Sequence, residues 1–390
     1  MKYLTRTIWL LSLVSLFTDL ASEMLYPIMP LYLQSIGFSV ALIGLLEGVA
    51  EATAGLSKGY FGQWSDRLGR RLPFVQWGYG LSALSKPMLA VLAAPWWVFL
   101  ARTTDRLGKG LRTGARDALL SEEASAGRHG AVFGFHRALD TLGAVLGPAV
   151  ALLWLARRPG QYPTLFLLAF IPGLLAILAT FLVREKLAPP SGKPIIPFWA
   201  SFSYWRRAPA AYRQLAGALL LFALFNSSDT LLLLLARQQG LSDTAVIGVY
   251  IFYNLVYAAA AFPAGLLSDR IGPRRVLVVG LLLFAAVYAG ATQAHAWPLF
   301  AALFGVYGLY AAATEGVSKA WLSQLCAPTD KGAALGTFAG LGSLAALVAS
   351  LGTGLLWQTL GPHVAFGLSA AVAAAVALFL ATTSFAASNE

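Results

Sequence analysis

Residues 102–117 carry seven charged side chains inside a largely apolar sequence. Placed on an α-helix, all seven fall within a sector of roughly 140°, and small or apolar residues occupy the other faces. Basic groups in this pattern can bind carboxylates or phosphates, and arginine does so through two parallel hydrogen bonds. The segment therefore predicts a charged stripe that binds an anionic solute, or a solvated loop if it lies outside a membrane. The seven are Arg102, Asp105, Arg106, Lys109, Arg112, Arg116 and Asp117.

The composition indicates a membrane protein. The 390 residues are 58% hydrophobic and 12% charged, whereas soluble domains have about 25% charged residues. The single cysteine, Cys326, excludes an internal disulfide and a cysteine-rich metal site, so we expect neither metal nor cofactor. Eleven windows are long and apolar enough to cross a bilayer, approximately 7–33, 39–61, 73–93, 130–156, 162–183, 213–236, 245–267, 275–294, 298–320, 333–357 and 362–383.

An internal repeat in the sequence predicts a twelfth membrane span. GQWSDRLGRR at 62–71 matches GLLSDRIGPRR at 265–275, and GRHGAVFGF at 127–135 matches TDKGAALGT at 329–337. The offset is nearly constant, which indicates two homologous halves. It places 97–118 opposite the apolar segment 299–320, so we expect the charged stripe to lie on a membrane helix. We predict an all-α polytopic membrane protein with twelve transmembrane helices in two pseudo-symmetric six-helix bundles, 1–183 and 213–390, joined by a cytoplasmic linker at 184–212.

The basic residues outside the spans predict the orientation. With the amino terminus in the cytoplasm, sixteen bases lie on the cytoplasmic side and three on the opposite side. This bias follows the positive-inside rule and places both termini in the cytoplasm. The net charge of +11 is then an insertion signal, and we expect lipid, a small solute and protons as partners, without nucleic acid.

Charges within the spans are costly unless they face protein or water. Burial favours a protonated carboxyl and a neighbouring base favours the ionised form, so a base that moves relative to an acid can drive proton release. Permanent salt bridges are the alternative role for each of these groups. The candidates for proton coupling are Asp19, Glu23, Glu47, Glu51, Asp140 and His136. The candidates for substrate binding are Arg102, Asp105, Arg106, Lys109, Arg112, Arg137, Asn226, Asp229, Glu315 and Lys319.

These motifs resemble those of the major facilitator superfamily along essentially the whole chain. GQWSDRLGRR is similar to the family's loop signature G-x-L-A-D-R-x-G-R-R, with Trp64 and Ser65 replacing Leu and Ala. RTTDRLG at 102–108 keeps two positions of the helix-4 pattern R-x-x-Q-G-x-G. DRLGKGLRTGARDALL and FGFHRALDTLGAVLGP are similar to a bacterial and archaeal branch whose substrates are mostly unassigned, which predicts a cytoplasmic (inner) membrane location and a monomer.

Helix 5 partly matches the drug:proton antiporter signature G-x8-G-x3-G-P-x2-G-G. Gly134, Gly143, Gly147 and Pro148 have the required spacing, but the final glycine pair is replaced by alanine and leucine. Such glycines allow close helix packing, and in the family this signature accompanies export. The resemblance implies two bundles that rock about a central cavity lined by helices 1, 4, 7 and 10.

The loop signature implies a cytoplasmic gate. Asp66 can pair with nearby arginines or with the positive end of a helix in the other bundle, Gly62 permits close packing, and Gly69 permits a sharp turn. We expect Asp117 to pair with Arg70 or Arg71, and a static ion-pair cluster is the alternative to a gate. The complete gating set is Gly62, Asp66, Arg67, Gly69, Arg70, Arg71, Asp117, Gly143, Gly147, Pro148, Gly265, Asp269, Arg270 and Gly272.

The function predicted from these features is proton-coupled efflux of a small anionic or zwitterionic compound, such as an organic acid, a metal chelate or a drug-like molecule. Import of a similar solute by proton symport is the main alternative, and a receptor without transport is a weaker one. An enzyme is not expected, because the chain has no HExxH or GxSxG motif and its four histidines are scattered.

Overall fold

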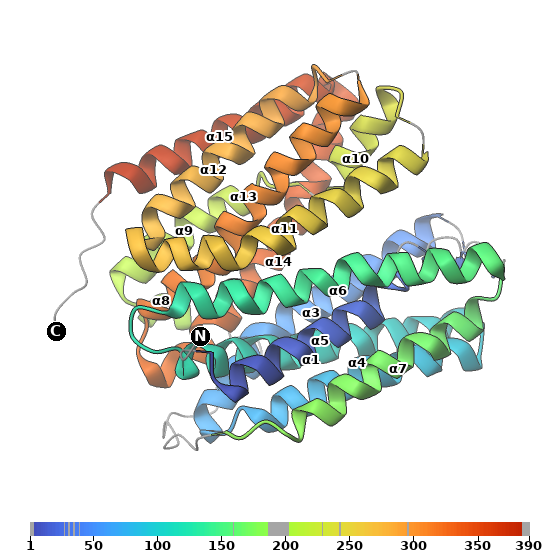
Figure 1. Cartoon of the computed structure of the whole chain (residues 1–390), viewed down its shortest axis with the longest axis horizontal. Coiled ribbons are helices and arrows are strands. Elements are labelled where there is room, and N and C mark those ends of the chain that lie inside the picture. The colour runs from blue at the N-terminus through green and yellow to red at the C-terminus, as the bar shows by residue number, and fades with distance from the viewer. Residues whose placement is uncertain are drawn as a thin grey trace. The chain divides into compact units, whose positions relative to one another are not determined.

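The computed structural model describes residues 4–26, 28–29, 32–33, 36–38, 40–158, 160–185, 203–227, 229–241, 243–294 and 296–383. These residues are almost entirely helical and contain no β-strand (Figure 1). The helices of the first half are α1 (Arg6–Glu23), α3 (Val40–Leu68), α4 (Leu72–Val91), α5 (Pro95–Glu123), α6 (His129–Arg157) and α7 (Tyr162–Thr180). The short α8 (Tyr204–Arg207) precedes α9 (Ala210–Ala223), α10 (Asp229–Gln238), α11 (Asp243–Ile271), α12 (Pro273–Ala291), α13 (Trp297–Gln324), α14 (Lys331–Leu360) and α15 (Pro362–Thr382).

The element order confirms the predicted fold class. Among the described residues, six long helices precede α8, and six spans follow it when α9 and α10 are taken as one interrupted span. Seven of the described helices are long and apolar enough to cross a membrane. Helix α5 is not among the seven, because its charges lower its hydropathy, but it is a single helix of 29 residues as the repeat predicted.

The chain divides into two compact units. Unit 1 comprises Met1–Ala124, Leu139–Arg207 and Ala327–Ser343, and unit 2 comprises Ser125–Ala138, Ala208–Cys326 and Leu344–Glu390. Each unit therefore includes the first residues of one helix, α14 or α6, from the other half of the sequence. Most of the predicted linker lies outside the described residues, and its end carries α8 and the beginning of α9.

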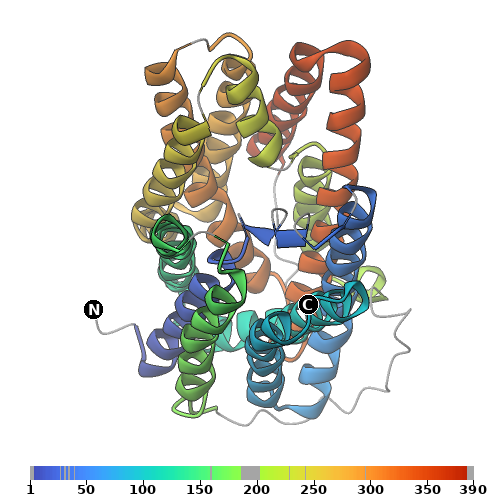
Figure 2. The same cartoon turned by 90° about the vertical axis from the view of Figure 1, so that its right-hand side faces the viewer.

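Helix packing repeats in the two units, as the sequence repeat requires. In unit 1, α5 packs against α3 and α4, and α4 packs against α7 (Figures 1 and 2). In unit 2, α13 packs against α11 and α12, and α12 packs against α15. A proline close to the start of α4, α5, α7, α12, α13 and α15 favours these helix beginnings, because proline lacks the N–H that has no partner there.

Two predicted spans are not continuous helices. The windows 7–33 and 213–236 predicted one helix each, but α1 ends at Glu23 and α9 ends at Ala223, with α10 beginning at Asp229. At the end of α1, the carbonyl of Ser22 accepts hydrogen bonds from Leu25 and Tyr26, which tightens the last turn. Hydropathy windows cannot detect these breaks, because the flanking residues remain apolar. Interrupted helices at matching positions of two repeats are typical of transporter binding sites.

Candidate functional site

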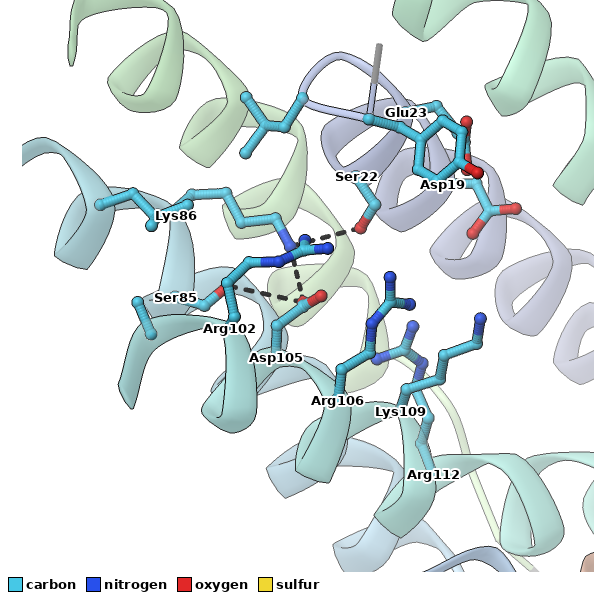
Figure 3. A pocket seen from close by; sticks show the side chains of 14 residues that line it. Asp19, Ser22, Glu23, Ser85, Lys86, Arg102, Asp105, Arg106, Lys109 and Arg112 are labelled. Atoms are coloured by element: carbon cyan, nitrogen blue, oxygen red, sulfur yellow. Dashed lines mark hydrogen bonds and ion pairs between the residues drawn. The ribbon is translucent and has the colours of Figure 1, made fainter. Parts of the chain in front are cut away.

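A charged pocket lies within unit 1, between α1, α4 and α5 (Figure 3). The surrounding helices are apolar toward their neighbours, so the pocket gathers charges that cannot face lipid. Its lining contains five bases and three acids. The charged residues are Asp19, Glu23, Lys86, Arg102, Asp105, Arg106, Lys109 and Arg112. The pocket thus brings together five of the ten predicted substrate-binding residues and two of the predicted proton-coupling acids.

One ion pair in this pocket joins α4 to α5. Lys86 Nζ lies 2.8 Å from Asp105 Oδ1, with only 3% and 11% of the two side chains exposed. The same ammonium group donates to Ser22 Oγ on α1 at 3.3 Å. Asp105 was predicted to contact substrate, but its carboxylate is already bound by Lys86, so its direct effect is to position Lys86 and join α4 to α5.

The other α5 bases extend toward α1 (Figure 3). Lys109 and Arg112 interact electrostatically with Asp19, and Lys109 and Arg106 interact in the same way with Glu23. Oε2 of Glu23 accepts no hydrogen bond from the part of the chain that the structure describes. The two sides of the pocket therefore present opposite charges to a solute, with Asp19 and Glu23 on α1 and Arg106, Lys109 and Arg112 on α5.

Arg112 is oriented by two neighbours on α4. Its Nη1 donates to Ser82 Oγ, and its guanidinium lies 4.4 Å from the ring centre of Tyr79. A stacked, hydrogen-bonded guanidinium loses little further freedom when it binds a carboxylate. Gly78 and Gly108 make this contact possible, because a Cβ on Gly108 would lie 2.5 Å from the carbonyl oxygen of Gly78. The small residues of α5 therefore position its charged ones.

The stripe continues along α5 into a buried network. Arg116 pairs with its neighbour Asp117 at 2.8 Å and donates to Ser15 Oγ at 3.3 Å. Ser15 in turn donates to Asp140 on α6. Asp140, a predicted proton-coupling residue, is therefore connected through one serine on α1 to the base at the far end of the stripe.

The first loop signature joins three elements at the end of α3. Both carboxylate oxygens of Asp66 accept backbone N–H groups at the start of α14, from Gly332 at 3.1 Å and Ala333 at 2.7 Å. Arg71 pairs with Asp66 at 2.8 Å and also with Glu122. A carboxylate that caps a helix N-terminus interacts favourably with the helix dipole. The contact predicted for Asp66 at a helix of the other half is therefore present.

The partner predicted for Asp117 was wrong. Asp117 pairs with Arg116 rather than with Arg70 or Arg71. It is completely buried on the inner face of α5, whereas Arg70 is exposed and Arg71 is bound by Asp66 and Glu122. Arg67 is half-buried and Arg270 is exposed.

The second loop signature makes the matching contacts within unit 2. Asp269 accepts backbone N–H groups from Gly130 and Ala131 at the start of α6, each at 2.8 Å. Glycines allow this approach, since a Cβ on Gly265 or Gly62 would overlap the backbone of Gly130 or Gly332. Gly69 and Gly272 have positive φ angles of 61° and 91°, which form the turns after the two aspartates.

The glycines of the antiporter-like signature lie on α6 and pack against α1. A Cβ on Gly143 would lie 2.5 Å from the carbonyl oxygen of Leu16, and one on Gly147 would lie 2.8 Å from the nitrogen of Met24. Pro148 lies inside α6 next to this contact. These glycines thus hold α6 against the segment of α1 that carries Asp19 and Glu23.

The predicted residues of the second half lie near a group of tyrosines in unit 2. Tyr307 donates to Asp229 at 2.6 Å, and Asn226 donates to the hydroxyl oxygen of Tyr310 at 2.9 Å. Asp229 begins α10, directly after the interruption that follows α9. The break therefore places one carboxylate among phenolic hydroxyls.

His136, Arg137, Glu315 and Lys319 also belong to unit 2. Arg137 pairs with Glu315 and lies 5.7 Å from the ring centre of Tyr257. His136 is buried on α6, and Lys319 is half-buried on α13. Glu47 and Glu51 belong to α3, but their side chains are outside the described part of the structure.

Comparison with known proteins identifies the family. The model of the Major Facilitator Superfamily matches residues 11–253 and 217–388. The chain belongs to the Major Facilitator Superfamily. An MFS-type transporter of Methanocaldococcus jannaschii is 31% identical over 371 residues, covering 94% of this chain and 92% of that protein. Multidrug resistance protein MdtG of Salmonella paratyphi A is 26% identical over 276 residues, covering 68% of this chain and 67% of that protein.

Solved structures of this superfamily share the fold. The human organic anion transporter MFSD10 superposes with a TM-score of 0.84 at 18% identity, covering 96% of this chain and 99% of that chain. The transporter FucP in its outward conformation superposes with a TM-score of 0.77 at 14% identity, covering 98% and 100%. This chain is thus a polytopic membrane transporter, and its family consists of transporters rather than enzymes.

Sequence reasoning missed several residues of this superfamily member's pocket. Lys86 was not among the predicted site residues. It is the single charge in the span 73–93, and such a charge requires a buried partner. Ser22, which lines the pocket, and Ser82 and Tyr79, which orient Arg112, were also missed. Polar and aromatic residues are common in membrane helices and carry no distinguishing pattern.

Proposed function

We propose that this superfamily member exports a small zwitterionic or anionic compound in exchange for protons. The observation that carries the proposal is the pocket of unit 1, in which bases on α5 face acids on α1. Arginines and a lysine there supply charge-assisted hydrogen bonds to a carboxylate or phosphate. Asp19 and Glu23 supply carboxyl groups that exchange protons next to the same solute.

The direction of transport rests on two further features. The glycines of the partial antiporter signature pack α6 against the segment of α1 that carries the acids. A Cβ added to Gly147 would lie 2.8 Å from the backbone nitrogen of Met24. MdtG, a relative whose name describes multidrug resistance, matches 68% of this chain. Both features favour efflux of a drug-like or metabolic compound.

We further propose that the two loop aspartates form the cytoplasmic gate. Each caps the start of a helix that belongs to the other half of the sequence, Asp66 at α14 and Asp269 at α6. Release of both caps would free these helix ends when the cytoplasmic side opens. The same proposal places the protein as a monomer in the cytoplasmic membrane of a bacterium or archaeon, with both termini in the cytoplasm.

Two measurements test this function. Purified protein is first screened by thermal shift against citrate, iron(III) citrate, glutamate and norfloxacin, which represent organic acids, chelates and zwitterions. A compound that binds is then followed in proteoliposomes under imposed pH gradients of either sign. Antiport predicts that external acid drives loss of the preloaded solute, and the Lys109→Gln variant should abolish it. Accumulation of the solute with external acid would instead establish symport.

Symport is the second candidate, and one observation favours it for a purely anionic solute. Asp19 and Glu23 line the same pocket as the bases, so protonating them makes the pocket more positive. Such a solute would bind together with protons rather than in competition with them.

A further inference from the structure

A second cavity is formed by residues of the second half of the sequence. It is a groove of about 620 Å³ in unit 2, between α9 and α15. Its walls are almost wholly apolar, and its size falls in the range of small-molecule pockets. The lining residues are Arg213, Gln214, Gly217, Ala218, Leu221, Phe225, Val372, Ala375, Val376 and Phe379.

The groove arises from two facing stripes. Arg213, Gly217 and Leu221 recur every four residues and so share one face of α9, and Phe225 follows two residues after that helix ends. Gly217, Ala218 and Ala375 have small or no side chains, which leave space between the two helices. The matching pair in the first half, α1 and α7, packs closely along its length, whereas α9 and α15 contact each other much less. The two halves therefore differ in how this helix pair packs, and the looser packing of α9 and α15 leaves the apolar groove in the second half.

One end of the groove is positively charged. Arg213 is exposed, and its guanidinium makes no ion pair or hydrogen bond with the residues that the structure describes. Arg274 binds the carbonyl oxygen of Leu380 at 2.6 Å, which places a second positive charge at the same end of α15. The positive-inside bias assigns this end to the cytoplasmic leaflet, where anionic lipids attract basic residues.

We propose that this groove binds one anionic phospholipid of the cytoplasmic leaflet. An acyl chain occupies the apolar stripe between α9 and α15, and the phosphate is bound by Arg213 with support from Arg274. The apolar walls accommodate the acyl chain, and the arginine selects the headgroup. The site is independent of the solute and of the direction of transport.

The test uses purified full-length protein in detergent with added dioleoyl phosphatidylglycerol or dioleoyl phosphatidylcholine. Native mass spectrometry measures the retained lipid, and thermal unfolding measures stabilisation. We expect phosphatidylglycerol to be retained preferentially and Arg213→Gln to weaken its retention about fivefold. Ala375→Phe, at an exposed lining position, should fill the groove and remove both lipids.

Matched controls decide the source of any effect. Arg206→Gln removes an equal charge from an exposed position of α8, outside the groove lining, and should leave retention unchanged. Glycerol 3-phosphate should give no stabilisation without an acyl chain. Equal loss in Arg206→Gln and Arg213→Gln would show only general charge attraction and would overturn the site, as would retention that survives Ala375→Phe. A dimer that Ala375→Phe dissociates would assign the groove to a second copy and would also overturn the proposal.

Discussion

The ion pair between Lys86 and Asp105 allows the structural and binding roles of the pocket charges to be separated. The pair joins α4 to α5 at 2.8 Å and is almost completely buried. Breaking a buried pair by removing one partner costs about 3–5 kcal/mol, because the other charge is left without compensation. Removing both partners costs much less, since no isolated charge remains.

The surroundings predict that the two single variants differ. After Lys86→Met, Asp105 still has Arg102 and Arg106 as neighbouring positive charges. After Asp105→Asn, Lys86 loses the negative charge of its partner and faces Arg102 and Arg112 as like charges. We therefore expect a loss near 3 kcal/mol for Lys86→Met and near 5 kcal/mol for Asp105→Asn. The double variant should lie within about 1 kcal/mol of the original protein.

The assay is unfolding of detergent-solubilised protein followed by tryptophan fluorescence, combined with binding of the compound found by the thermal-shift screen. The double variant keeps the pocket's excess of two positive charges, because it removes one base and one acid from five and three. It should therefore retain binding, whereas Lys109→Gln should lose binding and keep its stability. Additive losses in the double variant, or a larger loss for Lys86→Met than for Asp105→Asn, would refute this account of the pair.

Three further predictions follow from the packing and the caps. Asp66→Asn should lower the free energy of unfolding by about 1–3 kcal/mol, and Asp269→Asn by less, because Asp66 also pairs with a buried arginine; chemical unfolding of both variants tests this order. Gly143→Val should destabilise by at least about 1–3 kcal/mol through overpacking against α1, while Gly342→Ala, with open space around it, should be neutral; equal melting temperatures would contradict the packing. Arg137→Gln should change stability by less than about 1 kcal/mol, because its partner is 46% exposed, so any loss of solute binding in this variant reports function.

The repeat and the charge pattern predicted most of the fold. The offset between the two aspartate signatures predicted a membrane helix at 97–118, and α5 occupies that region. Helix periodicity also predicted that the charges of α5 share one face. The breaks after Glu23 and Ala223 were not predicted, because they depend on local backbone hydrogen bonds that average hydropathy does not report.

The sequence predicted most of the charged residues of the site, but it did not predict which of them form ion pairs with each other. The charged stripe predicts that the basic residues lie together on one face of α5. Whether Asp105 contacts a solute or pairs with Lys86 depends on how α4 is aligned along α5. That alignment is set by contacts such as Gly78 against Arg112, which no single-helix pattern contains. The error at Asp117 has the same origin, since the choice among nearby arginines depends on which of them is buried.

The charge of the pocket connects the nature of the solute to the direction of coupling. With Asp19 and Glu23 ionised, the lining has an excess of two positive charges, and protonation of both raises this excess to four. A purely anionic solute binds the protonated pocket more tightly, and by reciprocity it increases the affinity for protons. Anion and proton would then move in the same direction.

A solute with an ammonium group beside its carboxylate behaves differently. Its cationic end competes with protons for the acids on α1, while its carboxylate binds the bases on α5. Competition for one site is what exchange in opposite directions requires, because the two bound species must exclude each other. Coupling through Asp19 and Glu23 therefore favours antiport for a zwitterion, whereas for a simple organic acid it favours symport, the second candidate function.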